Sequence, residues 1–301
     1  MTRPPVGVIG LGIMGSAMTV NLMQAGFPVI GYDVLAQRRR DHSRAGGRIA
    51  RNGREVGRRA DVVICSLPSS AALIQTSADL AASPRPGRIV VETSTLPIAV
   101  KEAARRLLAP GGTTLLDSPL SGTGAQARTK DLVVYASGDR KAYRRVVPIL
   151  EAVARAHYYI GAFGTGSKMK FVANLLVAVH NVAAAEAIVL GMKAGLDPSM
   201  IVEVIGEGAG SSRMFEMRGP MMAKGQYADA TMKLAVWQKD MAIIADFARE
   251  VGSPTPLFAA TAPIYTAAAA TCRETDDTAA VCAVLEKMAG VRRNSKFKSR
   301  K

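Results

Sequence analysis

The chain has 301 residues, about half of them apolar, which suffices for one large domain or two domains with substantial cores. No apolar run reaches the roughly 18 residues of a membrane span without a charge or a glycine, so we expect no membrane segment. The formal net charge is +15, to which residues 38–59 contribute +7 (nine Arg against two acids) and residues 291–301 contribute +6. Basic segments can bind nucleic acid, but they also form solvated faces or surround an anionic cofactor, and we favour the last two.

Cysteine and histidine are sparse and scattered. Cys65, Cys272 and Cys282 are widely spaced, and the three histidines form no metal-binding spacing with them. We therefore expect reduced thiols in a cytoplasmic protein, without a disulfide framework or a metal site.

The chain begins with a strand, a glycine-rich turn and a helix. Residues 6–9 are predicted as a short apolar strand and residues 16–24 as a helix. The turn between them contains Gly10, Leu11, Gly12, Ile13, Met14 and Gly15. In a dinucleotide-binding fold, Gly10 would permit the tight turn, Gly12 would let the pyrophosphate approach the backbone, and Gly15 would let the helix pack on the strand.

A second strand, 29–32, ends at Asp33, about 20 residues after the turn. A carboxylate there accepts hydrogen bonds from the ribose hydroxyls of NAD and repels the 2′-phosphate of NADP. Arg38, Arg39 and Arg40, at the start of the next predicted helix, could instead attract that phosphate. We predict NAD as the cofactor, with a moderate preference that leaves NADP possible.

Strand and helix signals alternate in the following segments. The predicted strands are 60–66, 89–92, 114–117, 131–136 and 157–160, with helical crossovers such as 71–82 and 98–108. This alternation predicts a parallel sheet that is covered on both faces and binds ligands at the carboxyl ends of its strands. Four candidate contacts follow such ends: Leu67, Pro68, Thr95 and Ser121.

Residues 164–195 contain no Pro and are rich in Ala, Leu and Val, so they predict a helix of roughly 40 Å. Lys170 and Asn174 are four residues apart and share one face of it. An amine and an amide at the start of a buried helix indicate a functional site. The alternative is that Lys170 extends to solvent.

The remaining segments carry no strand signal. Helices are predicted at 198–207, 211–222, 231–251, 256–271 and 276–289. We therefore expect a Rossmann-type α/β domain (1–163), an interdomain helix (164–195), an all-α domain for substrate binding and oligomerisation (196–290) and a basic disordered tail (291–301). The apolar helices predict a homo-oligomer.

Four stretches resemble the β-hydroxyacid dehydrogenase family, which includes 3-hydroxyisobutyrate dehydrogenase and tartronate semialdehyde reductase. They are GLGIMGSAMTVNL (10–22), DSPLSGTGAQA (117–127), GTGSKMKFVAN (164–174) and WQKDM (237–241). Their order is that of the family, and the resemblance spans about residues 5–290. It implies a dimer or tetramer that transfers a hydride between a nicotinamide cofactor and a small β-hydroxyacid or its semialdehyde.

The resemblance also implies residue roles. Lys170 would be the catalytic acid/base, and Ser121, Gly122 and Asn174 would hold the substrate. Lys239 would lie near the nicotinamide, supported by Asp240. The chain departs from the family at Ala173, where a second Asn is usual, and at Thr123, where a second Gly is usual. The Thr123 hydroxyl lies beside the predicted carboxylate site and favours a substrate with extra hydroxyls. The sequence does not choose between 3-hydroxyisobutyrate, glycerate or tartronate semialdehyde, and threonate-like acids.

An amine can exchange a proton with an alcohol in both reaction directions if its pKa falls from about 10.4 toward the working pH. Burial and a nearby Lys239 would both lower the pKa of Lys170. Two other functions remain open: imine reduction on the same scaffold, whose enzymes tend to replace this Lys, and a non-catalytic protein that senses a cofactor or binds nucleic acid.

Overall fold

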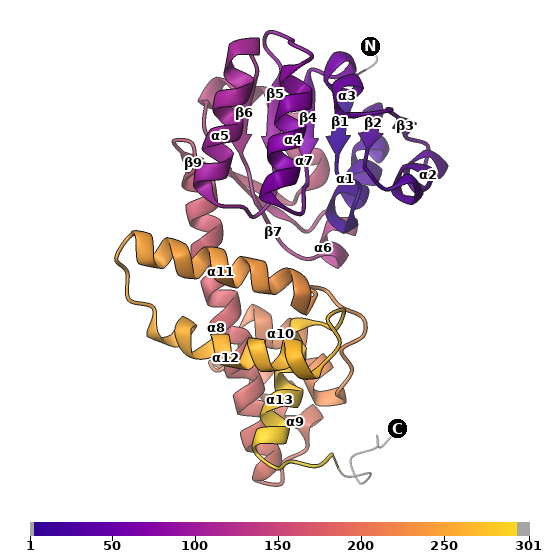
Figure 1. Cartoon of the computed structure of the whole chain (residues 1–301). Helices are drawn as coiled ribbons and strands as arrows, with labels where there is room; N and C mark the ends of the chain where they lie inside the picture. Colours follow the sequence, from indigo (N-terminus) through magenta and orange to yellow (C-terminus); the bar gives the residue numbers. More distant parts are fainter. Residues whose placement is uncertain (1–2, 294–301) are drawn as a thin grey trace. The chain divides into compact units, whose positions relative to one another are not determined.

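The computed structural model describes residues 3–293, and the chain divides into two compact units, Met1–Phe171 and Val172–Lys301. We describe each unit by itself. Figure 1 labels the elements along the chain.

The first unit is built on one nine-stranded sheet. Its strands are β1 (Val6–Ile9), β2 (Val29–Tyr32), β3 (Arg48–Ile49), β4 (Val62–Cys65), β5 (Ile89–Glu92), β6 (Thr114–Asp117), β7 (Leu120–Ser121), β8 (Val133–Ser137) and β9 (Ala156–Gly161). The order is β3-β2-β1-β4-β5-β6-β8-β7, with β9 paired to β8. The Rossmann-type prediction is confirmed, since β1 lies between β2 and β4 in parallel register.

The expectation of a wholly parallel sheet is wrong at one end. β8 runs antiparallel to both β6 and β7. The connection from β6 to β8 contains only the two-residue β7 and the five-residue helix α6 (Gly124–Arg128). A parallel return needs a crossover long enough to carry the chain back along the sheet, and this segment does not supply one.

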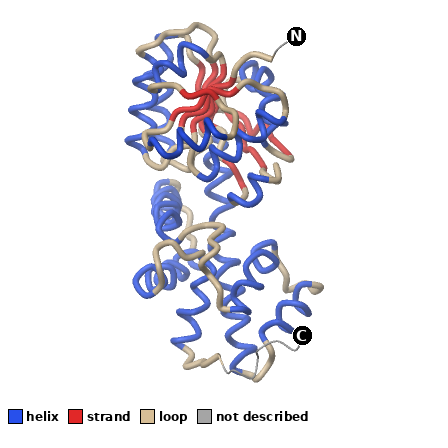
Figure 2. Tube along the Cα trace, turned by 90° about the vertical axis from the view of Figure 1, so that its right-hand side faces the viewer, coloured by secondary structure: helices blue, strands red, loops and turns tan. Residues whose placement is uncertain are grey.

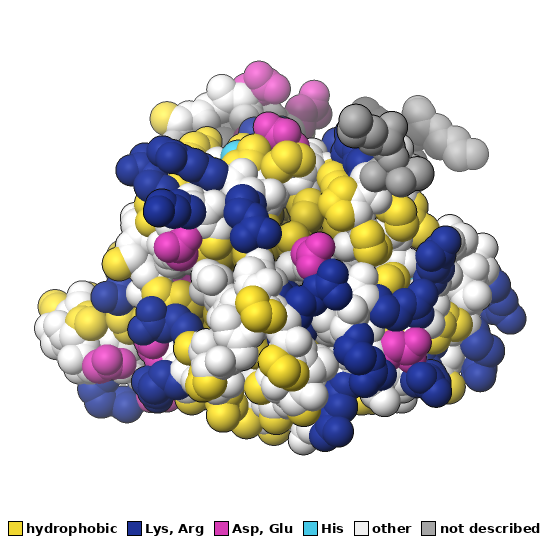
Figure 3. Space-filling view, turned by 90° about the horizontal axis from the view of Figure 1, so that it is seen from above, with side chains coloured by type: hydrophobic (Ala, Val, Ile, Leu, Met, Phe, Trp, Pro, Cys, Tyr) yellow, Lys and Arg dark blue, Asp and Glu magenta, His cyan; other side chains and the backbone are white. Residues whose placement is uncertain are grey.

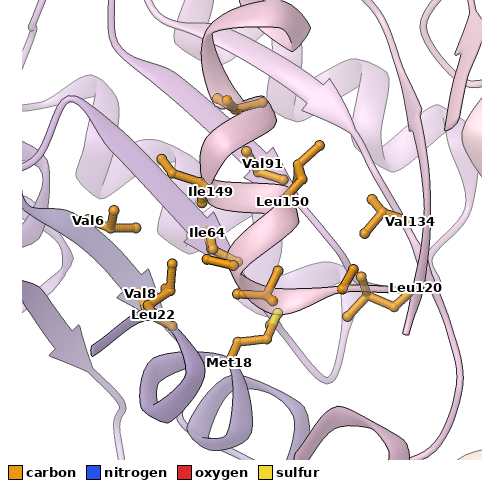
Figure 4. Packing of buried hydrophobic residues seen from close by; sticks show 14 of the residues in the cluster. Val6, Val8, Met18, Leu22, Ile64, Val91, Leu120, Val134, Ile149 and Leu150 are labelled. Carbon is orange, nitrogen blue, oxygen red and sulfur yellow. The ribbon is translucent and has the colours of Figure 1, made fainter. Parts of the chain in front are cut away.

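Helices cover both faces of the sheet (Figures 1 and 2). They are α1 (Ile13–Gln24), α2 (Ala36–Arg44), α3 (Gly53–Arg59), α4 (Ser70–Ala81), α5 (Ile98–Leu108) and α7 (Arg140–Val153), with a 3₁₀ turn at Ala109–Gly111. Alternating strand residues feed two cores. Ile64 packs in the core beneath α1 and α7, together with Met18 and Ile149 (Figure 4), and the adjacent Val63 packs in the core beneath α3, α4 and α5.

The second unit is helical, as predicted, with no named strand among its described residues. It consists of most of α8 (Thr165–Lys193) and of α9 (Pro198–Gly206), α10 (Arg213–Lys224), α11 (Leu234–Glu250), α12 (Pro256–Thr271) and α13 (Val281–Met288). The helix predicted at 276–289 is divided, because a 3₁₀ turn at Thr278–Ala280 precedes α13. Asp277 caps this turn by accepting the N–H of Ala279.

Helix α8 has 29 residues and is long and apolar enough to cross a membrane. Its middle is packed inside the second unit, however. Nδ2 of the buried Asn181 lies 2.9 Å from the hydroxyl of Tyr265 and 3.0 Å from the carbonyl of Thr278. This is the packing of a core helix, and it is consistent with a soluble protein.

Basic side chains are numerous on one face of the molecule. Figure 3 shows many more Lys and Arg side chains than acidic ones on the face seen from above. Residues 294–301, most of the tail predicted to be disordered, lie outside the described residues. Arg293 is described: it pairs with Glu286 and donates to the carbonyls of Met222 and Ala223.

Candidate active site

The turn between β1 and α1 requires glycine at two positions. Gly10 has a φ of +92°, and a Cβ there would lie 2.0 Å from the carbonyl oxygen of Ser66. A Cβ on Gly15 would lie 1.8 Å from the carbonyl oxygen of Gly10. Both glycines therefore hold the backbone in a shape that no other residue allows.

Gly12 faces a groove along the first turns of α1. A Cβ on Gly12 would lie 3.6 Å from Nη1 of Arg38, so no backbone blocks this side of the turn. The groove is lined by Leu11, Gly12, Ile13, Ser16, Ala17, Val20, Asn21, Arg38 and Arg128. An exposed helix N-terminus flanked by two guanidinium groups fits the pyrophosphate of a dinucleotide.

Asp33 is buried at the end of β2 and is held by three groups. Its Oδ2 accepts the N–H of Leu11 at 2.8 Å and lies 3.2 Å from Nη1 of Arg38. Its Oδ1 accepts the N–H of Leu35 at 2.8 Å. Because a carboxylate oxygen has two lone pairs, Oδ1 can also accept a ribose hydroxyl. Asp33 therefore supports the glycine turn and keeps the capacity to accept a further hydrogen bond.

The loops after β4 and β5 are joined to each other. The N–H of Leu67 donates to Oγ of Ser94 at 2.8 Å. This bond fixes the start of Leu67-Pro68 against the loop that contains Thr95, all of which were predicted as cofactor contacts. The carboxyl ends of neighbouring parallel strands thus meet at one edge, as the sequence predicts.

β7 ends at Ser121, and the short segment from there to Thr123 leads into α6, beside the glycine turn. Gly122 has a φ of +132°, and a Cβ on it would lie 2.6 Å from the Leu132 side chain. Thr123 starts α6 with a capping box, exchanging hydrogen bonds with Gln126. A Cβ on Gly124 would lie 2.3 Å from Cγ2 of Ile13, so α6 is pressed against α1 (Figure 1).

Lys170 is buried near the start of α8 and belongs to the first unit. The beginning of this helix is held by Asp117, the last residue of β6. Oδ2 of Asp117 accepts the N–H of Ser167 at 2.8 Å, and Oδ1 accepts the Ser167 hydroxyl at 2.8 Å. A carboxylate at a helix N-terminus satisfies amides that have no partner within the helix.

Asn174 and Lys239 belong to the second unit. Asn174 is buried one turn beyond Lys170, and its Nδ2 donates to Oδ2 of Asp240 at 3.0 Å. Nζ of Lys239 lies 3.2 Å from Oδ1 of the same carboxylate. Asp240 therefore fixes the side chains of both Asn174 and Lys239.

The sequence analysis did not single out Lys101 or Arg128. Lys101 is fully buried among acidic groups, and the sequence does contain a pattern that indicates its burial. It shares the spacing of the buried Ala104 and Leu108 on one face of α5, so a charge falls where an apolar residue is expected. Arg128 gave no signal, because only the packing of α6 on α1 brings it to the groove.

Comparisons with known proteins agree with this geometry. Residues 5–161 match the family model of the NAD-binding domain of 6-phosphogluconate dehydrogenase. Residues 164–285 match the model described as NAD-binding of NADP-dependent 3-hydroxyisobutyrate dehydrogenase. The two models together span nearly all the described residues.

Individual relatives cover the chain almost end to end. An L-threonate dehydrogenase of Cupriavidus necator is 36% identical over 92% of this chain and 94% of its own length. The crystal structure of a 3-hydroxyisobutyrate dehydrogenase from Salmonella typhimurium has a TM-score of 0.85 at 30% identity, covering 94% of this chain and all of that one. The structure of Psf3 in complex with NADP+ has a TM-score of 0.84 at 25% identity, covering 93% of this chain and 99% of that one. The chain therefore belongs to the NAD(P)-dependent β-hydroxyacid dehydrogenases, the family of 3-hydroxyisobutyrate dehydrogenase.

Proposed function

We propose that this enzyme oxidises a small hydroxyacid with additional hydroxyl groups, of the L-threonate class, with Lys170 as the general acid/base. The observation that carries the proposal is the placement of Lys170: a buried amine in the first turns of a helix whose start is bonded to the carboxyl end of β6. The substrate class is supported by the 36% identity to an L-threonate dehydrogenase over nearly the whole chain.

The chemistry requires a hydride and a proton to leave the substrate alcohol. A nicotinamide cofactor, held by the glycine turn, would supply the acceptor for the hydride of the carbinol carbon. Lys170, in its neutral form, takes the hydroxyl proton, so the alcohol becomes a carbonyl and the amine becomes an ammonium. In the reverse direction the Lys170 ammonium returns this proton to the oxygen that becomes the alcohol.

Other residues would orient the substrate. The Ser121 hydroxyl and the Gly122 N–H are proposed to bind the carboxylate, while the missing Cβ of Gly122 makes room for the Leu132 side chain. The amide of Asn174 would hold a hydroxyl group. Because Nδ2 of Asn174 donates to Asp240, Oδ1 of Asn174 points away from that carboxylate and can accept the hydrogen of the hydroxyl. The Thr123 hydroxyl already exchanges hydrogen bonds with Gln126 as the cap of α6. A contact of this hydroxyl with the substrate would therefore be a second role.

The cofactor side of the site is proposed to involve the glycine turn (Gly10, Gly12, Ile13, Met14 and Gly15), Asp33, the strand-end residues Leu67, Pro68 and Thr95, and Lys239. We propose NAD as the preferred cofactor, because Asp33 stands where the ribose binds in this fold. Arg38 moderates the preference, since it neutralises part of the Asp33 charge. We further propose a cytoplasmic homodimer or homotetramer.

The direct test is a turnover panel of L-threonate, D-threonate, 3-hydroxyisobutyrate and D-glycerate with NAD and with NADP. We expect the highest kcat/KM with a threonate. The carbonyl products should be reduced in the reverse reaction, with tartronate semialdehyde included for comparison. A clear preference for 3-hydroxyisobutyrate would overturn the proposed substrate class, and absence of turnover with every acid and aldehyde would overturn the proposed function.

A further inference from the structure

A cluster of buried charges lies where β5 and β6 end. Glu92 is the last residue of β5, Asp117 is the last of β6, and Lys101 reaches them from α5; all three side chains are 0% exposed. Nζ of Lys101 lies 2.7 Å from Oε2 of Glu92, 2.8 Å from Oδ1 of Asp117 and 2.7 Å from the carbonyl oxygen of Ser94. Three acceptors therefore satisfy the three ammonium protons.

Lys101 is charged in this environment. Burial by itself would lower the pKa of Lys101, but the charges and hydrogen bonds of Asp117 and Glu92 outweigh it, and the pKa is raised. Two acidic side chains therefore face one cation in the interior. Buried ion pairs are weak contributors to stability compared with apolar packing, so stability alone is a poor reason for this cluster.

One side of the cluster holds the start of α8. Asp117 binds both the N–H and the hydroxyl of Ser167. Ser137, whose hydroxyl lies 3.2 Å from Oδ2 of Asp117, accepts the N–H of Gly166 at 3.0 Å. A Cβ on Gly166 would lie 2.2 Å from the carbonyl oxygen of Tyr135, so the helix starts in direct contact with the sheet. Lys170 is one turn away.

The other side of the cluster holds the cofactor-side loops. Oε1 of Glu92 accepts the N–H of Ser94 at 2.9 Å, and Lys101 binds the Ser94 carbonyl. Ser94 in turn accepts the N–H of Leu67 through its hydroxyl. A chain of hydrogen bonds thus runs from the loop after β4, through the loop that contains Thr95, to Lys101 and on to Ser167.

We propose that Lys101 is a positioning residue for hydride transfer. It fixes the first turn of α8, one turn before Lys170, relative to the loops after β4 and β5, which carry the predicted cofactor contacts. The inference rests on the proposed role of Lys170. Displacing a reacting group by about 1 Å can cost on the order of 100-fold in rate, so a rigid link between these segments affects the chemical step.

The mild test is Ser167→Ala, which removes one hydrogen bond to Asp117 and retains the backbone N–H. The matched control is Thr165→Val at the same helix start, because the Thr165 hydroxyl donates to the carbonyl of Ala162 and lies outside the cluster. The readout is the single-turnover rate of cofactor reduction, divided by the amount of enzyme that has cofactor bound. It is measured once with ordinary substrate and once with substrate deuterated at the carbinol carbon.

We expect Ser167→Ala to lower this rate by about tenfold or more, within the roughly 100-fold range of misplacement, and to raise the deuterium isotope effect on kcat/KM. The Kd of the cofactor should change by less than about twofold, and Thr165→Val should behave as wild type. A purely structural role would reduce the amount of binding-competent enzyme and leave the rate per bound cofactor unchanged. That result would overturn the proposal.

The stronger variant, Lys101→Met, is followed by hydrogen exchange in the full-length protein. The amides of Gly166 and Ser167 should exchange faster than in wild type by about tenfold or more, while amides in the middle of α7 stay protected. Unchanged exchange at both amides would overturn the proposal. If the wild type turns over none of the acids, the proposed function fails, and the exchange measurement still decides whether Lys101 holds the helix start.

Discussion

Nη1 of Arg38 lies 3.2 Å from Oδ2 of Asp33, so the carboxylate that ends β2 carries its own counter-ion. The same guanidinium faces Gly12 across the groove beside α1. The two side chains would act on cofactor choice in opposite directions, because the Asp33 carboxylate would repel the 2′-phosphate of NADP and the Arg38 guanidinium would attract it.

Arg38→Ala should increase the preference for NAD over NADP. Charge-assisted hydrogen bonds contribute about 1.5–3 kcal/mol, so the ratio of kcat/KM values should rise by about tenfold or more if Arg38 binds the 2′-phosphate. Arg40→Ala is the matched control, because Arg40 lies on the same helix and pairs with Gln37. Asp33→Asn should shift the ratio toward NADP. A wild-type kcat/KM that is higher with NADP would contradict the account of this strand end.

His42 predicts a pH dependence of stability. The His42 side chain projects from α2 and is buried against Gly31 and Gly47. Burial lowers the pKa of His42 from 6.5, and an interaction with the Arg48 backbone opposes this shift with a smaller effect. As the pH falls below about 6.5, His42 therefore binds a proton in the unfolded chain before it does so in the folded chain. The free energy of unfolding then decreases as the pH falls from about 6.5 to the lowered pKa of the folded state. Above 6.5 both states are neutral at this residue.

Urea unfolding at pH 8 and at pH 5.5 measures this effect. The wild type should lose more unfolding free energy between the two pH values than His42→Phe, in which another aromatic ring fills the site and the titration is removed. An equal loss in both proteins would show that His42 does not contribute.

The second unit exposes large apolar side chains, which predicts association. Leu190, Leu257 and Met288 are each at least 70% exposed, and Val204 is 65% exposed. Apolar side chains that gather in one exposed patch mark protein interfaces, and we expect these side chains to contribute to one. Sedimentation at micromolar concentration should show a dimer or tetramer, and a single monomeric species would contradict the prediction.

Sequence reasoning located the local features of the site. The turn at Gly10–Gly15 and the four-residue strands were predictable because their signals lie within a few residues of one another. The antiparallel β8 was missed, since strand direction depends on where a connection leads in space. Lys101 was also missed, because its partners Glu92 and Asp117 are 9 and 16 residues away along the chain and meet it only in the folded sheet.

Thr123 shows a second limit of prediction from the sequence. Its hydroxyl was interpreted only as a substrate contact, yet it closes a capping box with Gln126. The pattern Thr-x-x-Gln was visible in the sequence, but the five-residue helix that it starts was too short to predict from periodicity.

The most direct test of the account is Lys170→Ala, compared with Lys168→Ala as the matched control. Both lysines lie in the first turns of α8, but Lys168 is exposed and Lys170 is buried. Lys170→Ala should lower kcat on the preferred acid by about 10²–10⁴-fold, the usual effect of losing a general acid/base, with the Kd of the cofactor nearly unchanged. Lys168→Ala should retain most activity. Near-normal turnover of Lys170→Ala would remove Lys170 from the mechanism and contradict the central claim.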